Sequence, residues 1–565
     1  MGTTRRFLVP AVCAAMALAV LAPLFGRGFV LVYDMVFAPR QDLLPDTLGL
    51  GTALPRAVPA DAVVALATHV VPGDLVQQLV LAAALFAGPL GAARYLKDEP
   101  PGVQVVAAVA YGWSAYVAER LFIGHWPYLL AYASLPWIAR FARKPRTAKA
   151  TKKSTATKKP AAAESPKAAA RLILAMAPAV LTPAGGILAA GTAVVAGGVR
   201  RLWLTATVSV VLNAPWWVPA VLHPGGGLSD SAGVEAFGAR AESWGGTLTS
   251  LLGLGGIWNA EVVPASRTNP VVPVLILAVT AVAIIGMQHL PRGMVGLGVA
   301  GLVLALVGGT AALGWVVEHV PGAGLLRDSQ KWVAWWALPL ALGFALGVRQ
   351  AAEALKRGRK AVLAGAAIIP IAMMPDLAWA GWGRLAAVDY PQDWAAVRQI
   401  LETSTRDGDV VTVPFGGFRQ FGWNDGRTQY DPAPAYLPRT TVVDDTLVVD
   451  GHPVPGEDRR AAAVRTALTD GRDLTELGIR WVLVQHGTPG RVPANLLISD
   501  ERIYHGRWLD LYELGGPTQP DTTGRPPKAP VIAADVLALA TVTLCLLWLV
   551  LPAGSLRRSS RRTRE

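Results

Sequence analysis

Acidic, basic and aromatic side chains stand at the ends of apolar runs in three places of the sequence, and their chemistry suits proton transfer and anion binding. The first place is LVYDMVFAPRQD, where Asp34 follows the first apolar run and Asp42 comes soon after. Charged groups near the hydrocarbon of a membrane are costly unless they are paired or face water, which makes Asp34 a functional candidate. A carboxylate there could act as a general base or bind hydroxyl groups. The alternatives are a solvated helix-end carboxylate for Asp34 and a turn residue for Asp42.

The second place is SAYVAERLFIGHWPY, where an acid–base pair ends one apolar run and two aromatic residues begin the next. Glu119 and Arg120 form the pair, and His125 and Trp126 follow Gly124. The pair could be a structural clamp, and the two rings could belong to the aromatic belt at a membrane surface. The same side chains also suit sugar binding, because an aromatic face packs on C–H groups while an imidazole bonds to hydroxyls.

The third place is LLRDSQKW, where Arg327, Asp328 and Lys331 stand just before an apolar run. Arginine binds phosphate through its bidentate fork and lysine as a point charge, so the two cations are candidates for an anion site. A phosphate held at the surface of a bilayer would belong to a phospholipid or a polyprenyl phosphate. A local ion pair between Arg327 and Asp328 is the alternative.

The composition indicates which elements must position these residues. Of the 565 residues, 52% are hydrophobic and only 16% are charged, with a mean hydropathy of +0.39. A helix that crosses a bilayer takes about 20 apolar residues, and by that criterion the chain is a polytopic α-helical membrane protein with about twelve transmembrane helices. The expected spans are 7–26, 75–93, 102–118, 126–142, 171–184, 186–199, 202–221, 270–286, 294–316, 332–348, 361–379 and 531–552.

The net charge of +13 follows from membrane topology rather than from nucleic-acid binding. With the N-terminus in the cytoplasm, every strongly basic segment falls on the cytoplasmic side. These segments together carry +23, which leaves −10 of the total of +13 for the rest of the chain. An excess of Lys and Arg on cytoplasmic loops is the rule that sets orientation. We therefore expect a multi-pass protein of the plasma membrane with both termini in the cytoplasm.

The composition also divides the chain into four segments. Residues 1–380 form the transmembrane helical module, in which 143–170 is poor in large apolar residues and is expected to be a disordered basic cytoplasmic loop. Residues 381–528 alternate strands, such as TTVVDDTLVVDG and IRWVLVQHG, with helices, and predict an exterior soluble α/β domain. A final transmembrane helix over 529–552 leads to a basic cytoplasmic tail, 553–565.

Several common site motifs do not occur in the sequence. There is no G-x-x-x-x-G-K-[ST] phosphate loop, no H-E-x-x-H and no C-x-x-C, and Cys13 and Cys545 lie far apart within apolar runs. These absences argue against a nucleotide-binding loop, a zinc protease site and a disulfide framework.

Taken together, the motifs resemble those of the actinobacterial GT-C membrane glycosyltransferases. The likeness rests on an acidic residue soon after the first helix, YVAERLFIGHW followed by LPW, NAPWWVP at the end of a later helix, LRDSQKW before another, and LGIRWVLVQ in the α/β domain. It spans most of the chain. Members of that family use polyprenyl-phosphate sugars, such as decaprenyl-phosphoryl arabinose or mannose, to build cell-envelope glycans and lipoglycans.

The resemblance implies an inverting transfer of arabinofuranose or mannose from a polyprenyl-phosphate donor to a cell-envelope glycan or lipoglycan on the exterior face. Asp34 would be the catalytic base, and Arg327 with Lys331 would bind the donor phosphate. GT-C enzymes usually have an acidic pair in the first loop, whereas this chain has a single Asp34, with Asp42 and Asp46 further on. No metal ligand is therefore assigned, and a divalent cation stays open. The candidates for substrate binding are Asp42, Glu119, Arg120, His125, Trp126 and Asp328.

Two other classes of function stay open. A non-catalytic envelope-assembly or scaffold protein would use the α/β domain to bind partners, and substitution of Asp34 would then have no effect. A transporter of lipid-linked sugars would show internal repeats between the halves of the helix bundle, and none is visible in the sequence. The expected partners are the lipid-linked donor, a glycan acceptor and membrane lipids, without nucleic acid.

Overall fold

The computed structural model describes residues 2–143, 166–224, 227–355, 358–449, 451–493, 501–518 and 524–551. Most of the basic loop expected over 143–170 and the whole of the expected tail lie outside the described residues. The last residues of that loop belong instead to helix α7 (Pro166–Met176). The sequence AAARLILAM in this helix consists almost entirely of good helix formers.

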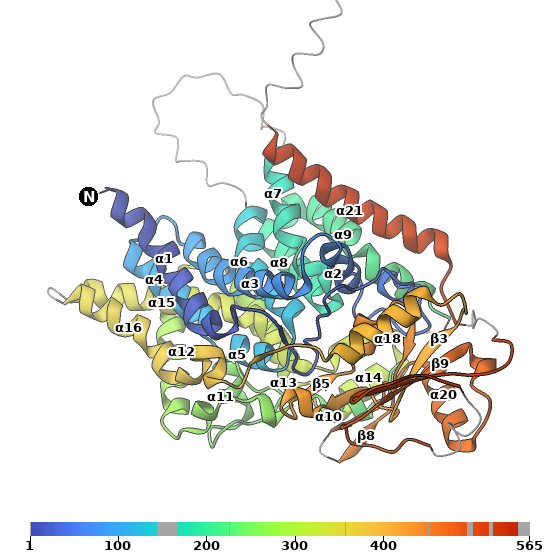
Figure 1. Cartoon of the computed structure of the whole chain (residues 1–565). Helices are drawn as coiled ribbons and strands as arrows, with labels where there is room; N and C mark the ends of the chain where they lie inside the picture. The colour runs from blue at the N-terminus through green and yellow to red at the C-terminus, as the bar shows by residue number, and fades with distance from the viewer. Residues whose placement is uncertain are drawn as a thin grey trace, which may run out of the picture.

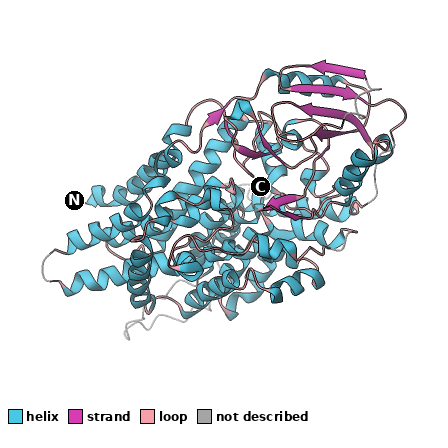
Figure 2. Cartoon of the chain, turned by 90° about the horizontal axis from the view of Figure 1, so that it is seen from below, coloured by secondary structure: helices cyan, strands magenta, loops and turns pink. Residues whose placement is uncertain are grey.

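A large helical module precedes a smaller α/β domain, whose strands gather at one end of the molecule (Figures 1 and 2). Helix α15 (Ala334–Ala354) is at the centre of the module, almost wholly buried between its neighbours. The other long helices of the module are α1 (Gly2–Leu21), α3 (Gly73–Tyr95), α4 (Pro101–Gly112), α6 (Trp126–Ala142), α8 (Pro183–Gly197), α9 (Leu202–Leu222), α12 (Val272–Met287), α13 (Arg292–Leu306), α16 (Arg359–Met373) and α21 (Lys528–Val550).

Five of the described helices are long and apolar enough to cross a membrane, or seven if each sharply bent pair is one span. The bent pairs are α13 with α14 (Ala311–His319), at 93°, and α16 with Pro375–Trp382, at 69°. The expected number of about twelve is not confirmed. One reason is that apolar runs are broken into shorter helices: the run 102–118 is divided at Trp113 into α4 and α5 (Ala115–Phe122).

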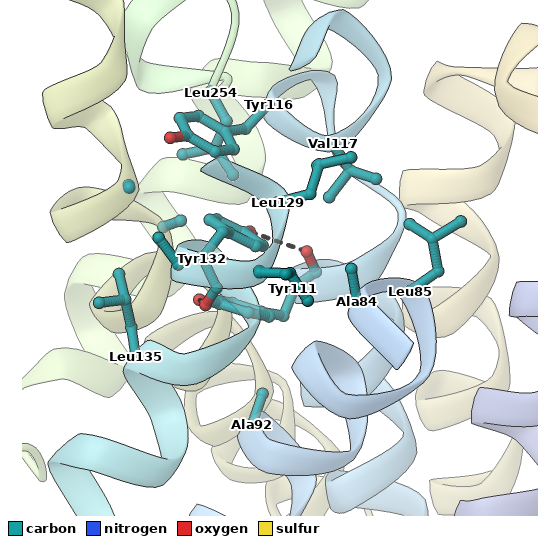
Figure 3. Packing of buried hydrophobic residues seen from close by; sticks show 14 of the residues in the cluster. Ala84, Leu85, Ala92, Tyr111, Tyr116, Val117, Leu129, Tyr132, Leu135 and Leu254 are labelled. Carbon is teal, nitrogen blue, oxygen red and sulfur yellow. Dashed lines mark hydrogen bonds between the residues drawn. The ribbon is translucent and has the colours of Figure 1, made fainter. Parts of the chain in front are cut away.

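Stacked tyrosine rings fix α5 against its neighbours (Figure 3). Tyr111 and Tyr132 stack with ring centroids 4.2 Å apart, and each hydroxyl donates to the backbone carbonyl of the other residue, at 2.7 and 2.8 Å. Tyr116 of α5 stacks on Tyr132 at 4.7 Å. The Arg120 guanidinium lies 5.7 Å from the centroid of the Tyr116 ring, one helical turn away. The Arg120 guanidinium therefore lies against one end of the tyrosine stack.

The α/β domain has three layers. Its five-stranded sheet has the order β10-β11-β9-β3-β6, in which β3 is parallel to β6 and β9, whereas β11 is antiparallel to β9 and β10. Helix α18 (Gln392–Thr403) packs on one face and α20 (Arg459–Asp470) on the other. Every residue of β9 is buried, as expected for a strand covered on both faces. The strands are β3 (Asp409–Val413), β6 (Thr441–Val442), β9 (Ile479–Gln485), β10 (Glu501–His505) and β11 (Leu509–Glu513).

Two hairpins of the domain lie outside this sheet. One consists of β4 (Phe418–Gln420) and β5 (Thr428–Tyr430), and the other of β7 (Leu447–Val449) and β8 (His452–Val454). TTVVDDTLVVDG, which is predicted as one strand, is thus divided between β6 and β7.

The segment between α1 and α2 (Ala60–Thr68) joins the two parts of the molecule. Its strand β1 (Phe29–Val30) pairs with β2 (Ala387–Val388) at the start of the domain. Further along, Asp42 forms an ion pair with Arg398 of α18, and Arg56 forms one with Glu457 at 2.6 Å. The domain is therefore docked on this segment along most of its length.

Candidate functional site

A tight turn after α1 presents Asp34. Val32 and Met35 exchange two backbone hydrogen bonds, at 3.3 and 2.8 Å, which leaves Tyr33 and Asp34 at the tip. Tyr33 has φ of 41°, a conformation that is uncommon for a residue with a bulky side chain. The N–H of Tyr33 donates to the carbonyl of Thr428, and the carbonyl of Tyr33 accepts from the N–H of Tyr430, both at 2.7 Å. The domain therefore holds the turn in this conformation.

A glycine brings a second turn, between α5 and α6, against the first. Gly124 has φ of +79°, and a Cβ atom there would lie 2.3 Å from the backbone nitrogen of Met35. The N–H of Asp34 donates to the carbonyl of Ile123 at 3.2 Å. Only glycine permits the two turns to approach this closely. The approach places His125, which follows Gly124, beside Asp34.

Four side chains form a hydrogen-bonded chain from Asp34 into the interior. His125 Nε2 lies 2.9 Å from Asp34 Oδ2, and His125 Nδ1 lies 2.7 Å from Nη1 of Arg120. Arg120 binds Asp328 through both Nη atoms, at 2.6 and 2.9 Å. A guanidinium only donates, so Nδ1 of His125 accepts and Nε2 carries the hydrogen donated to Asp34. His125 is therefore a neutral imidazole that occupies one carboxylate oxygen of Asp34.

Solvent reaches mainly the Asp34 end of this chain. The side chain of Asp34 is 46% exposed, that of His125 15%, and that of Arg120 not at all. Burial opposes ionisation of Asp328, but the Arg120 guanidinium, with help from the charge of Lys331, lowers its pKa to about 2. Asp328 is thus an ionised partner of Arg120, and Asp34 is the carboxylate of this chain that faces solvent.

Gln330 joins Arg120 to a second buried carboxyl group. Its Oε1 accepts from Arg120 Nε at 3.0 Å, and its Nε2 donates to Glu119 Oε2 at 3.2 Å. Within the described structure the other oxygen of Glu119 has no hydrogen-bond donor. Burial, followed by the charge of Glu242, raises the pKa of Glu119 well above 4.5. The raised pKa favours the protonated form of Glu119 beside the Glu242 carboxyl group. Only its place in LRDSQKW marks Gln330 in the sequence.

The two predicted phosphate ligands lie in different surroundings. Lys331, in the 3-10 helix η8 (Ser329–Val333), is only 4% exposed, with its ammonium 5.5 Å from the centroid of the Trp332 ring. Among the described residues it has no hydrogen-bond or ion-pair partner for that ammonium. Arg327 instead binds Glu457 of the α/β domain at 2.8 Å. Lys331 is therefore the cation available to an anion, and Arg327 takes part in domain docking.

Two other predicted site residues lie outside this cluster. Trp126 is buried against Phe37, with ring centroids 5.2 Å apart, and packs in the core. Asp42, bound to Arg398, borders a separate cavity of about 640 Å³. In the part of the chain that the structure describes, no group of three or more His, Cys, Asp or Glu is placed to hold a metal ion. The cavity is lined by Arg40, Asp42, Leu43, His69, Leu401, Glu402, Pro438 and Arg439.

Comparison with known proteins identifies the fold. No protein-family model and no curated protein sequence matches the chain. Among solved structures, the chain is similar to the arabinofuranosyltransferase AftD from mycobacteria, with a TM-score of 0.54 and 18% sequence identity over 91% of this chain and 40% of that chain. A weaker likeness is to ArnT from Cupriavidus metallidurans, solved bound to undecaprenyl phosphate, with a TM-score of 0.34 and 13% identity over 92% of this chain and 100% of that chain.

The chain thus has the fold of the GT-C membrane glycosyltransferases, which confirms the resemblance seen in the sequence. The particular likeness that carries this conclusion is to AftD, since the TM-score with ArnT is too low to add to it. The chain spans about two fifths of the length of the AftD structure.

Proposed function

We propose that this protein is an integral-membrane glycosyltransferase that moves a sugar from a polyprenyl-phosphate donor to a cell-envelope glycan or lipoglycan. One observation carries the proposal: within a GT-C fold, the exposed carboxylate of Asp34 is held by a neutral His125 that is itself fixed by Arg120. Arabinofuranose is the favoured sugar, because AftD is an arabinofuranosyltransferase. Mannose is the second candidate.

Asp34 is the general base of the proposed reaction. It takes the proton of the acceptor hydroxyl while that oxygen attacks the anomeric carbon from the side opposite the phosphate. The new C–O bond forms, the bond from the anomeric carbon to the phosphate oxygen breaks, and polyprenyl phosphate leaves with the bonding electrons, which inverts the configuration. His125 occupies Oδ2 of Asp34 and so leaves Oδ1 for the proton. General-base catalysis contributes about 10²–10⁴ in rate.

Lys331 is the proposed ligand of the donor phosphate. The buried ammonium of Lys331 is stabilised by the charge of Asp328, but Arg120 already binds that carboxylate. A phosphate would supply the negative charge that Lys331 does not share with Arg120. The same charge would stabilise the phosphate as it leaves, because preorganised cations act most strongly where water is excluded. Arg327 is reassigned to docking, since Glu457 already binds it.

Lys331→Gln should weaken binding of polyprenyl-phosphoryl arabinose about 10- to 100-fold, the equivalent of one charge-assisted hydrogen bond. Arg327→Gln, four positions earlier, is the matched control and should leave donor affinity unchanged, because Glu457 keeps its bond to Arg56. Titration of the purified protein in detergent measures both affinities. If Lys331→Gln binds the donor as tightly as the parent, Lys331 is not a phosphate ligand. If both variants lose donor affinity equally, Arg327 is a phosphate ligand as well.

The α/β domain is proposed to lie on the exterior face. Phe29, just after the C-terminal end of α1, pairs with the domain, and α21 begins at Lys528 just beyond the domain. The N-terminal end of α1 and the C-terminal end of α21 therefore point away from the domain (Figure 1). A reporter inserted near Gly451 should be exterior and one fused after Lys159 cytoplasmic, because basic segments stay inside. An exterior signal at Lys159 would reverse the orientation and move the site to the cytoplasmic face.

A further inference from the structure

The β4–β5 hairpin turns an aromatic and polar face away from the core of the α/β domain. The register places Phe418 opposite Tyr430 and Gln420 opposite Thr428. Opposed residues of an antiparallel pair share a face, so these four side chains lie on one side of the hairpin. The two rings meet edge to face with centroids 5.7 Å apart, and the Gln420 amide donates to the Thr428 hydroxyl at 3.0 Å. All four side chains are half-buried or exposed.

The opposite face of the same hairpin does the packing. Arg419 and Gln429 are at most 2% exposed. Arg419 forms a buried ion pair with Asp431 at 2.9 Å, and Gln429 accepts a hydrogen bond from Asn424. By contrast, neither aromatic ring of the outer face belongs to any hydrophobic cluster of the described residues. The two outer rings therefore pack against each other and lie outside the hydrophobic clusters of the domain.

This outer face adjoins Asp34. Tyr33 extends the hairpin through its two backbone hydrogen bonds to β5, and its ring centroid lies 6.5 Å from that of Phe418. Burial raises the pKa of Tyr430, and surrounding carboxylates, Asp34 among them, raise it further. The carboxylate proposed as the base thus stands at the edge of a surface built from three rings, an amide and a hydroxyl.

We propose that Tyr33, Phe418, Gln420, Thr428 and Tyr430 form an acceptor face, which binds the acceptor saccharide and brings its hydroxyl to Asp34. The inference rests on the proposed transferase function and names the part of the site that selects the acceptor. Aromatic rings pack on the C–H faces of a sugar, while amide and hydroxyl groups bond to its hydroxyls. The five side chains carry no formal charge at neutral pH, so they suit a neutral saccharide.

The two substrates would then reach Asp34 from different parts of the molecule. Lys331, the proposed phosphate ligand, belongs to the helical module, in line with a donor that is anchored in lipid. The acceptor face belongs to the α/β domain, apart from Tyr33. The turn that carries Asp34 is hydrogen-bonded to both parts of the molecule. Asp34 donates to Ile123 of the helical module, and the backbone of Tyr33 bonds to β5 of the α/β domain.

The test uses the purified full-length protein and a synthetic arabinofuranose oligosaccharide, with a mannose oligosaccharide in parallel. Phe418→Ala combined with Gln420→Ala should weaken oligosaccharide binding about tenfold and raise the acceptor KM to match, with donor affinity unchanged. Phe418→Tyr keeps the ring and should bind as the parent does. Val448→Ala changes an exposed side chain on the other hairpin and is the matched control.

Each outcome separates this inference from the proposed function. Parental acceptor affinity in the double variant overturns the acceptor face, and so does a loss confined to donor affinity. Should the double variant not fold, Gln420→Ala alone alters only an exposed side chain and should still weaken binding about threefold. Asp34→Asn should bind the oligosaccharide as the parent does, because the acceptor face is unchanged. A parent protein that binds the oligosaccharide but never transfers sugar would contradict the proposed function and leave the acceptor face standing. A parent that binds neither oligosaccharide overturns the inference.

Discussion

Asp34→Asn should lower sugar transfer by about two to four orders of magnitude, with expression and donor binding little changed. The amide has almost the same volume and still reaches His125, but it cannot take the proton of the acceptor hydroxyl. Asp34 stands 46% exposed at the tip of its turn, so the substitution removes no packing. The measurement is transfer of labelled sugar from a polyprenyl-phosphate donor to the acceptor oligosaccharide.

Two other aspartates provide controls for this result. Asp74 lies in the first turn of α3 and accepts a hydrogen bond from the N–H of Leu75, so Asp74→Asn should transfer sugar at the parental rate. Asp42→Asn weakens the contact with Arg398 but leaves the base intact, and should cost far less than the change at Asp34. Parental transfer by Asp34→Asn would exclude it as the base and favour a non-catalytic role.

Arg120→Gln should lower the free energy of unfolding by about 3–5 kcal/mol, because it leaves the carboxylate of Asp328 without its partner. Arg120 has no exposed surface and Asp328 is 17% exposed, so water compensates little. Transfer should fall as well, since His125 loses the donor that fixes its tautomer. Thermal unfolding in detergent measures the first effect, and transfer well below the transition temperature measures the second.

The double variant Arg120→Gln/Asp328→Asn separates these two roles. Removing both charges should restore most of the stability but not the transfer, because a buried pair is more costly to break than to replace. The pKa of Asp328 is lowered from 3.8 to about 2 in the folded protein. The contribution of the pair is therefore fully present above a pH of about 4 and is lost as the pH falls through about 2. If the double variant stays as unstable as Arg120→Gln, the explanation by an unpaired Asp328 carboxylate is wrong.

Apolar runs predict that helices cross or line a membrane, but they do not predict how many helices span it. A run records that its side chains avoid water, whether lipid or protein covers them. Of the most apolar 18-residue window in Ser329–Ala354, 94% is buried inside the protein, whereas only 11% of that in Lys528–Val550 is. Both segments pass the same length and hydropathy criteria for a membrane span. Where a run breaks, as at Trp113, is likewise decided by packing against neighbouring helices.

Within the α/β domain, the buried strand was predictable and the hairpins were not. IRWVLVQ is almost continuously apolar, as required of β9, which helices cover on both faces. In TTVVDDTLVVDG the strand ends at the two aspartates because of distant partners. Asp444 forms an ion pair with Arg465 of α20, and Asp445 accepts backbone N–H groups from residues 457 and 458. The local sequence around the two aspartates does not predict those contacts.

The sequence by itself determined which side chains to suspect, because the cost of charge near hydrocarbon is a local property of each residue. Asp34, Arg120 and Lys331 were all candidates on that ground. Only the tertiary structure decided their partners. Arg120 binds Asp328, 208 positions away, and this pair fixes His125 and through it Asp34. Arg327 and Lys331 stand four positions apart, yet Glu457 binds one and leaves the other free of ion pairs within the described structure. Residue type sets the chemistry of a group, whereas long-range packing sets the distances over which that chemistry acts.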